Sequence, residues 1–224
     1  MTKFQALWDR AAQRKGGKEA LALLMPATLS QTEFLSQTDD RWLSMMTRCV
    51  FRAGFVWRVI EHKWDGFEEA FSAFNIAGMS HLDDERLDRF AKDTRIVRNP
   101  QKIKSVRDNA IFVADIAEEH GSFSQFVANW PSEDIVGLWM VLKKRGSRLG
   151  GNSGPMVLRS MGKDTPILTY DVVAALVNHA VIDTDKVSSQ RAQRLIQDAF
   201  NQWQQETGLP LAHLSRIAAM AVGD

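Results

Sequence analysis

The chain has 224 residues, of which 45% are hydrophobic and 25% charged, and its formal net charge is +1. This is the composition of an ordinary globular protein with enough residues for a real core. Its single cysteine, Cys49, excludes an intramolecular disulfide and fits a reducing compartment. Because no run of about 18 apolar residues is present and charges interrupt the N-terminal segment, we expect no membrane span and no secretion signal, and therefore a cytoplasmic protein.

Helical periodicity dominates the first half of the chain. Asp39 and Asp40 stand where an N-cap belongs, and Ser80 with Asp83 resembles a capping box. The expected elements are helices over 3–14 and 18–25, a polar connection over 28–38, an apolar helix that carries Trp42 to Val50, a break at Ala53-Gly54 with a further helix opening at Phe55, and a helix that carries Leu82 to Phe90.

The second half continues the same pattern. Asn99-Pro100 begins a helix that Gly121 ends, and Ser132 is expected to cap the next one. An apolar run over 172–181 and helices over 188–206 and 211–220 complete the chain. No strand-like alternation occurs, so the predicted fold is all-α with roughly ten helices.

The stretch from Leu142 to Asp171 carries the strongest local signals. Four glycines fall within nine residues, namely Gly146, Gly150, Gly151 and Gly154, and they predict a tight turn between two helices. From residue 135 to 163 there are six Lys or Arg residues and no acid. Exposed N–H groups at a helix start, surrounded by cations, are typical of a phosphate site.

A second basic segment spans residues 92–107, with six Lys or Arg residues against one acid, Asp93. Two such segments on a nearly neutral chain favour a face that binds nucleic acid. Since any one charged run is more often a solvated face, no single cation in these segments is assigned on charge alone.

The hairpin at Leu149–Ser153, the Gly/Pro loop at Gly162–Pro166 and the later Asp171 resemble, in order and spacing, the helix-hairpin-helix DNA glycosylases. This resemblance implies an all-helical fold of two lobes with the active site in the cleft between them. The lobes would comprise residues 1–60 with 165–224, and residues 61–164. The hairpin would bind phosphate, which gives affinity without reading sequence.

A closer resemblance is to the 3-methyladenine DNA glycosylase I branch of that superfamily. It rests on residues 53–57, 95–103, 109–110 and 142–146, which read AGFVW, RIVRNPQKI, NA and LKKRG. In that branch a tryptophan at the position of Trp57 stacks on a flipped base. The backbone around the glycine of the Ala-Gly pair fills the gap left in the duplex.

Two departures from that branch are visible. Its base-reading glutamate, eight residues before the tryptophan, falls on Cys49, which offers no carboxylate. Its structural zinc needs Cys and His ligands that one cysteine and the scattered histidines do not supply, so we expect no metal. In contrast, Asp171 matches the catalytic aspartate of the wider superfamily, which that branch lacks.

We therefore assign Asp171 as the catalytic carboxylate, although at its position it could instead cap the following helix. The predicted base pocket contains Trp57, Cys49, Arg52 and Tyr170; Trp57 could instead be a core residue, and Cys49 a small buried filler. The predicted DNA-binding residues are Ala53, Gly54, Phe55, Arg98, Lys102, Lys144, Arg148, Gly150, Gly151, Asn152 and Ser153.

The sequence thus predicts a monomeric DNA glycosylase that excises an alkylated purine from double-stranded DNA without a cofactor. It would be monofunctional, because Asn152-Ser153-Gly154-Pro155 provides no amine where bifunctional members carry a lysine. Two alternatives remain open: excision of another damaged base such as a deaminated purine, and a non-catalytic DNA-binding protein. A single cysteine also excludes an iron–sulfur centre.

Overall fold

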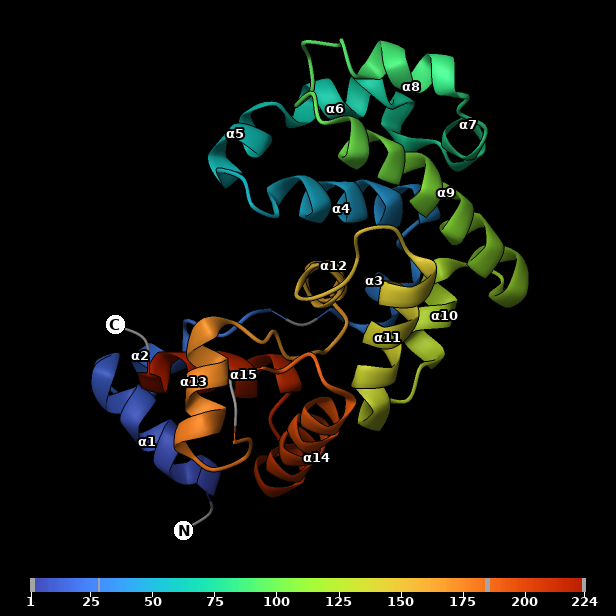
Figure 1. Ribbon diagram of the computed structural model, residues 1–224. Coiled ribbons are helices and arrows are strands. Elements are labelled where there is room, and N and C mark those ends of the chain that lie inside the picture. The colour runs from blue at the N-terminus through green and yellow to red at the C-terminus, as the bar shows by residue number, and fades with distance from the viewer. Residues whose placement is uncertain (1–2, 28, 184–185, 223–224) are drawn as a thin grey trace. The chain divides into compact units, whose positions relative to one another are not determined.

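A computed structural model describes residues 3–27, 29–183 and 186–222, and within these ranges every regular element is a helix (Figure 1). The all-α prediction is confirmed. The described ranges hold fifteen α-helices and two short 3-10 helices, more than expected, because several predicted helices are divided into short pieces. None of the described helices combines the length and the apolar character needed to cross a membrane.

The chain forms two compact units. Unit 1 comprises Met1–Thr28, Pro131–Gly137 and Gly162–Asp224, and unit 2 comprises Leu29–Trp130 and Leu138–Met161. This grouping differs from the predicted lobes, because residues 29–60 belong with the residues that follow them. The physical reason is α4 (Asp39–Arg52), which packs its apolar face against α9 (Pro100–His120) in the same unit.

Unit 1 is built around its last helix, α15 (Leu211–Val222), which packs against α1 (Lys3–Arg14) and α13 (Tyr170–Asn178). Phe4 of α1 is fully buried, and its ring centroid lies 5.2 Å from that of Trp203. The remaining α-helices of the unit are α2 (Lys18–Ala22) and α14 (Gln190–Thr207), and α11 (Ile135–Arg145) begins here.

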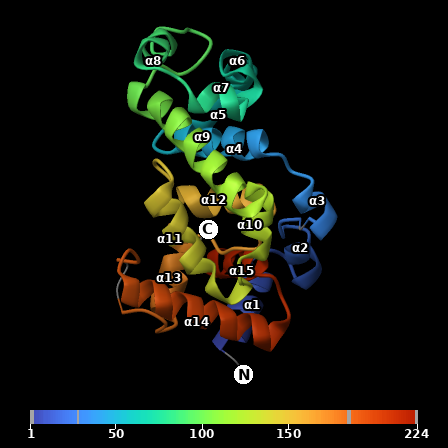
Figure 2. The same ribbon diagram turned by 90° about the vertical axis from the view of Figure 1, so that its right-hand side faces the viewer.

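Unit 2 has α4 and α9 at its centre, and two views show α9 crossing α4 (Figures 1 and 2). The other helices of the unit are α3 (Gln31–Leu35), α5 (Trp57–His62), α6 (Trp64–Ala70), α7 (Ile76–Ser80), α8 (Asp84–Phe90), α10 (Phe123–Asn129), the larger part of α11, and α12 (Ser153–Ser160).

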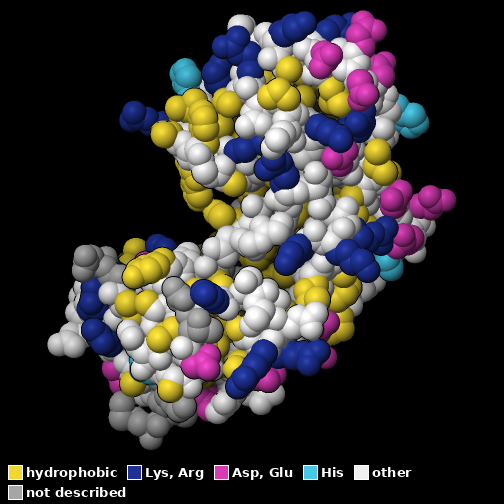
Figure 3. Space-filling model, viewed as in Figure 1, with side chains coloured by type: hydrophobic (Ala, Val, Ile, Leu, Met, Phe, Trp, Pro, Cys, Tyr) yellow, Lys and Arg dark blue, Asp and Glu magenta, His cyan; other side chains and the backbone are white. Residues whose placement is uncertain are grey.

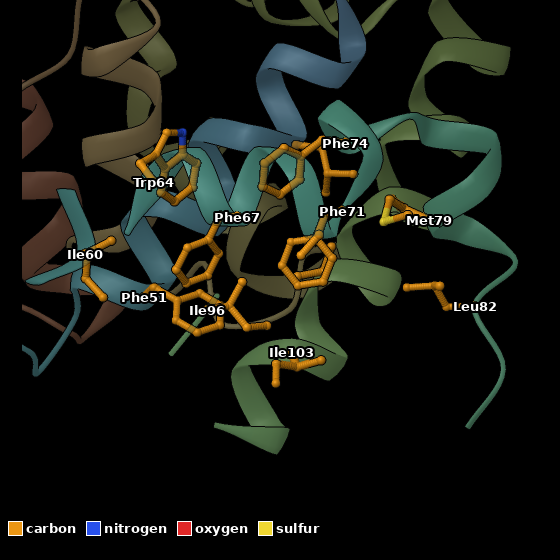
Figure 4. Close-up of a cluster of buried hydrophobic side chains, with 14 residues drawn as sticks. Phe51, Ile60, Trp64, Phe67, Phe71, Phe74, Met79, Leu82, Ile96 and Ile103 are labelled. Atoms are coloured by element: carbon orange, nitrogen blue, oxygen red, sulfur yellow. The ribbon is translucent and has the colours of Figure 1, made fainter. Parts of the chain in front are cut away.

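A cluster of buried aromatic and aliphatic side chains fills the space between α4, α6 and α9 (Figure 4). The ring of Trp64 stacks on Phe67 and on Phe74, with centroid distances of 5.1 and 5.8 Å. Phe51, near the end of α4, contacts Phe67 edge to face. This packing fixes the C-terminal end of α4, from which the loop to α5 departs.

Capping explains where the helices begin. Asn99 caps α9 as predicted, and Gly121 follows its last turn with a φ of 88°. The predicted caps of two other helices were wrong. Thr38 is the N-cap residue of α4, so Asp39 and Asp40 lie in its first turn. Asp83 alone caps α8, and Ser80 is the last residue of α7.

The connection predicted over 28–38 was also wrong, because it contains α3. Ser30 and Glu33 form a complete capping box there, a signal that the sequence carried. Ser132 begins a 3-10 turn over Ser132–Asp134 instead of capping an α-helix, and α11 starts at Ile135.

Candidate functional site

The predicted hairpin lies between α11 and α12, where two glycines permit close packing of the chain on itself. A Cβ on Gly154 would lie 2.7 Å from the Leu149 carbonyl oxygen, and one on Gly146 would lie 2.7 Å from the Leu142 carbonyl oxygen. Both distances are far inside van der Waals contact with backbone atoms, so only glycine fits. The turn therefore depends on these glycines for its shape.

The amide groups of the hairpin divide into free and occupied donors. The Ser153 N–H donates to the Gly150 carbonyl at 3.2 Å, and the Gly154 N–H donates to the Leu149 carbonyl at 3.1 Å. The N–H groups of Gly150 and Gly151, in contrast, have no acceptor among the described residues, and Gly151 is exposed with a φ of 59°. An anion at this hairpin would meet the amides of these two glycines.

A buried asparagine holds the hairpin loop from α9. Asn109 is 0% exposed, its Oδ1 accepts the Ser147 N–H at 2.7 Å, and its Nδ2 donates to the Ser147 carbonyl at 3.1 Å. The Ser147 hydroxyl also donates to Asp108 at 3.2 Å. The loop is thus attached to the rigid centre of unit 2 through both backbone groups of one residue.

Arg148 and Lys102 connect the hairpin to the start of α9 and the end of α4. Arg148 has a left-handed backbone with a φ of 62°, and its guanidinium hydrogen-bonds Gln101. Lys102 donates from Nζ to the carbonyl oxygens of Phe51 at 3.1 Å and Ala53 at 2.7 Å. Burial, with repulsion from Arg148, lowers the pKa of the Lys102 ammonium.

The place of Lys102 gives it a structural role that sequence reasoning missed. Its ammonium caps the C-terminal end of α4, because it donates to carbonyl oxygens that lack partners within the helix. It thereby fixes the loop over residues 53–56, which carries Gly54 with a φ of 68° in open space. Phe55 and Val56 are 45% and 64% exposed, so this loop presents apolar side chains to solvent.

Trp57, at the start of α5, is 49% exposed, and one face of its indole is covered by Arg52. The Arg52 guanidinium carbon lies 5.0 Å from the ring centroid, and Arg52 Nε donates to Glu61 at 2.7 Å. Arg48 donates to the same carboxylate. Burial alone would raise the pKa of Glu61, but the hydrogen bonds from Arg48 and Arg52 outweigh it and hold that pKa below its usual value.

Cys49 lies on α4 among these groups and is 4% exposed. Burial raises the pKa of its thiol to about 11, despite the opposing charges of Arg52 and Arg48. The thiol is therefore neutral near pH 7, and Glu61 is the ionised carboxylate that this part of α4 meets. Sequence reasoning did not select Glu61, because no motif in the chain places it beside Trp57.

Several cations of the two basic segments form ion pairs with acidic side chains of the protein itself. Arg95 bonds Asp93 and Glu69, Arg107 bonds Asp84, and Arg145 bonds Glu119. Arg98, Lys104, Lys143 and Lys144 are exposed and have no ion pair or hydrogen bond among the described residues. Figure 3 shows Lys and Arg side chains beside the loop between α11 and α12, and hydrophobic side chains near α5.

Asp171 belongs to unit 1 and lies in the first turn of α13, half-buried, with no hydrogen bond or ion pair among the described residues. The cap of that helix is Thr169, whose hydroxyl oxygen accepts the Val172 N–H at 3.3 Å. Asp171 is therefore not the N-cap residue. Its neighbour Tyr170 is 86% exposed.

The Gly/Pro loop before α13 is anchored by a different aspartate. Asp164 accepts the N–H groups of Leu211 at 2.9 Å and Ala212 at 2.8 Å, which are the first donors of α15. This arrangement satisfies two orphan amides and holds the loop against the core of unit 1.

Unit 2 thus brings together Trp57, Cys49, Arg52, the loop over 53–55, Lys102, Arg148 and the hairpin, while Tyr170 and Asp171 lie in unit 1. The residues do not fit the structural zinc of the 3-methyladenine DNA glycosylase I branch. The one cysteine is buried in α4 as a neutral thiol, and no three His, Cys, Asp or Glu side chains gather within the described ranges.

The all-helical fold, the glycine hairpin between two helices with cations beside it, and the exposed tryptophan directly after a glycine loop agree with the class expected from the sequence, the helix-hairpin-helix DNA glycosylases. The family model of methyladenine glycosylases matches residues 34–145, half of the chain. The chain belongs to the methyladenine glycosylase family, and it is a DNA N-glycosylase.

Solved structures share the fold. One is 3-methyladenine DNA glycosylase I from Staphylococcus aureus, 20% identical, with a TM-score of 0.52 and coverage of 69% of this chain and 90% of that one. Another is the 8-oxoguanine glycosylase/lyase from Methanocaldococcus jannaschii in complex with DNA, 17% identical, with a TM-score of 0.54 and 95% of each chain covered. No curated protein sequence matches the chain significantly.

Proposed function

We propose that this glycosylase removes an alkylated purine of the 3-methyladenine type from double-stranded DNA by hydrolysis and leaves the DNA backbone intact. The flipped base would stack on Trp57, and the loop over residues 53–55 would occupy the gap in the duplex. The observation that carries this proposal is the half-exposed Trp57, which begins α5 directly after the glycine loop and lies in the same unit as a hairpin with free amides.

The base class is supported by the family and by the fold neighbour from Staphylococcus aureus, whose structure describes the recognition of 3-methyladenine. The substrate class is supported by the neighbour from Methanocaldococcus jannaschii, which was solved with DNA containing 8-oxoguanine. The free amides of Gly150 and Gly151, with Lys144 and Arg148 nearby in sequence, would bind phosphates on either side of the lesion.

We assign the chemistry to Asp171. As the N-glycosidic bond breaks, the bonding electrons leave with the base, and positive charge develops on the sugar; a carboxylate stabilises that charge and orients the water that attacks. Asp171 suits this role because it has no partner among the described residues and lies in the first turn of α13, where the helix dipole favours an anion. The water supplies OH to the sugar, and its proton goes to the carboxylate or the departing base.

Release of free base from methylated duplex DNA tests the proposal. Asp171→Asn should lower the rate of release by about 10²–10⁴-fold. Trp57→Ala should raise KM for the methylated duplex. Asp198→Asn, which changes an exposed acid of α14, should change neither value. Release of hypoxanthine alone would favour the deaminated-purine alternative, and no release from any damaged duplex would leave the DNA-binding alternative.

A further inference from the structure

A row of alternating charges and aromatic rings lies between α4 and the helices α5 and α6. The guanidinium carbon of Arg52 lies 5.0 Å from the Trp57 ring centroid, and that of Arg48 lies 4.9 Å from the Trp64 ring centroid. Two carboxylates join the row, and we call its members the α4 ladder: Trp57, Arg52, Glu61, Arg48, Trp64, Glu68 and Arg41.

Arg52, at one end of the α4 ladder, affects which bases can stack on the exposed indole of Trp57. Because a guanidinium covers one face of Trp57, a cationic base on the opposite face would be repelled by it across the ring. For two unit charges separated by roughly 8 Å, at a dielectric constant between those of water and a protein interior, the repulsion is on the order of tenfold in affinity. Left unbalanced, Arg52 would therefore disfavour a positively charged purine.

Glu61 supplies the balancing charge. Its carboxylate accepts the Arg52 Nε–H at 2.7 Å and an Arg48 Nε–H at 3.3 Å, and its side chain is 35% exposed. The bond also fixes the guanidinium, because a carboxylate and a planar guanidinium constrain one another in direction as well as distance. Charge and orientation at the back of Trp57 thus both depend on Glu61.

We propose that Glu61 is a positioning residue that sets the specificity of the glycosylase: by holding and neutralising Arg52 behind Trp57, it leaves the open face of the indole able to stack on a positively charged alkylated purine. This inference rests on the proposed function, which makes Trp57 the stacking wall. Glu61 acts through Arg52 and need not touch the base.

The test compares Glu61→Gln with Glu68→Gln. Glu68 is a matched control because it occupies the same ladder and bonds Arg41, Ser44 and the Trp64 indole N–H, away from Trp57. Each variant is assayed on duplexes carrying 3-methyladenine, which is cationic in DNA, and on duplexes carrying hypoxanthine, which is neutral, scored as substrate or as competitive inhibitor.

The quantity compared is the ratio of kcat/KM for the cationic base to the affinity for the neutral base. Glu61→Gln should lower this ratio about tenfold, and Glu68→Gln should leave it at the wild-type value. An equal ratio in the two variants would overturn the inference.

A double-mutant cycle with Arg52→Gln separates this role from simple destabilisation. Once Arg52 is removed, no cation stacks on Trp57, and Glu61 keeps only Arg48, which lies over Trp64, so adding Glu61→Gln should change the ratio much less than it does in the wild-type background. If Glu61→Gln alone fails to fold, the Arg52→Gln and double variants still give the base ratio with and without the Glu61 carboxylate. An undiminished effect of Glu61→Gln in the Arg52→Gln background would refute the role through Arg52.

The inference and the proposed function fail in different ways. If the wild-type protein releases no alkylated base, both are wrong. If it releases the base and Trp57→Ala raises KM for that release, while Glu61→Gln keeps the wild-type ratio, only the role of Glu61 is wrong.

Discussion

Asn109 and Ser147 are joined by two hydrogen bonds between one buried side chain and both backbone groups of one loop residue, at 2.7 and 3.1 Å. A carboxamide is the only neutral side chain that donates and accepts in this way from adjacent positions. The hairpin loop is therefore fixed to α9 by a fully buried residue. Its effect on DNA would be exerted through the position of the hairpin.

We expect Asn109→Leu to lower the free energy of unfolding by about 1–3 kcal/mol, because it leaves the Ser147 N–H and carbonyl without partners. It should also weaken DNA binding by displacing the hairpin. Ser147→Ala is the matched control, since it removes the hydroxyl and keeps both backbone bonds, and it should change stability little. Urea denaturation and binding to an undamaged duplex measure the two effects; equal stability losses in the two variants would contradict the role given to Asn109.

Lys144→Gln and Arg148→Gln should each weaken binding to every DNA sequence and reduce the slope of log K against log salt by about 0.9. The reason is that each cation would neutralise one phosphate and release one counterion. Arg145→Gln is the control, because the Arg145 guanidinium already pairs with Glu119 at 2.8 Å. A salt slope unchanged in both test variants would exclude this surface as the phosphate contact.

Asp164→Asn should destabilise unit 1 by about 1–2 kcal/mol, because an amide oxygen replaces the carboxylate that accepts two N–H groups at the start of α15. Thermal denaturation measures this loss. The effect should appear in stability while the rate of base release by the folded fraction is retained, in contrast to Asp171→Asn. Loss of turnover without loss of stability would mean that Asp164, and not Asp171, carries the chemistry.

The thiol of Cys49, with its pKa raised to about 11, should be almost fully protonated between pH 7 and 9. Because the thiolate is the reactive form, a disulfide reagent should label the folded protein slowly over this range and label the unfolded protein at once. The labelling rate should rise with added denaturant. Rapid labelling of the folded protein that levels off near pH 8.5 would show an ordinary, exposed thiol instead.

Much of the helical pattern could be predicted from local signals. Asn99-Pro100 and Gly121 bound α9 as expected, and the amphipathic spacing of residues 3–14 gave α1. These signals work because a cap or a glycine acts within one turn of the helix it begins or ends. The predictions failed where two signals competed, as at Asp39 and Asp40, which follow the cap Thr38, and where the box at Ser30 was overlooked.

The candidate site was predictable only in part. The hairpin, Trp57 and Asp171 could be selected because they fall on motifs. The partners of Arg52 and Lys102 could not be selected. Glu61 on α5 accepts a hydrogen bond from Arg52 on α4, and Lys102 donates to the Ala53 carbonyl, 49 residues away in sequence. Such contacts depend on how α4, α5 and α9 pack, and a cation in a basic segment looks the same in sequence whether it binds phosphate or closes a helix.

Arg148 adopts a backbone conformation that glycine would occupy more cheaply, by roughly 1 kcal/mol, and glycines stand two and three positions further along. An Arg148→Gly protein would be relieved of this strain, but it would lose the hydrogen bond to Gln101 and gain backbone freedom when unfolded, so the two effects on the unfolding temperature oppose one another. The strain at Arg148 is thus offset, at least in part, by the contact of its own side chain with the start of α9.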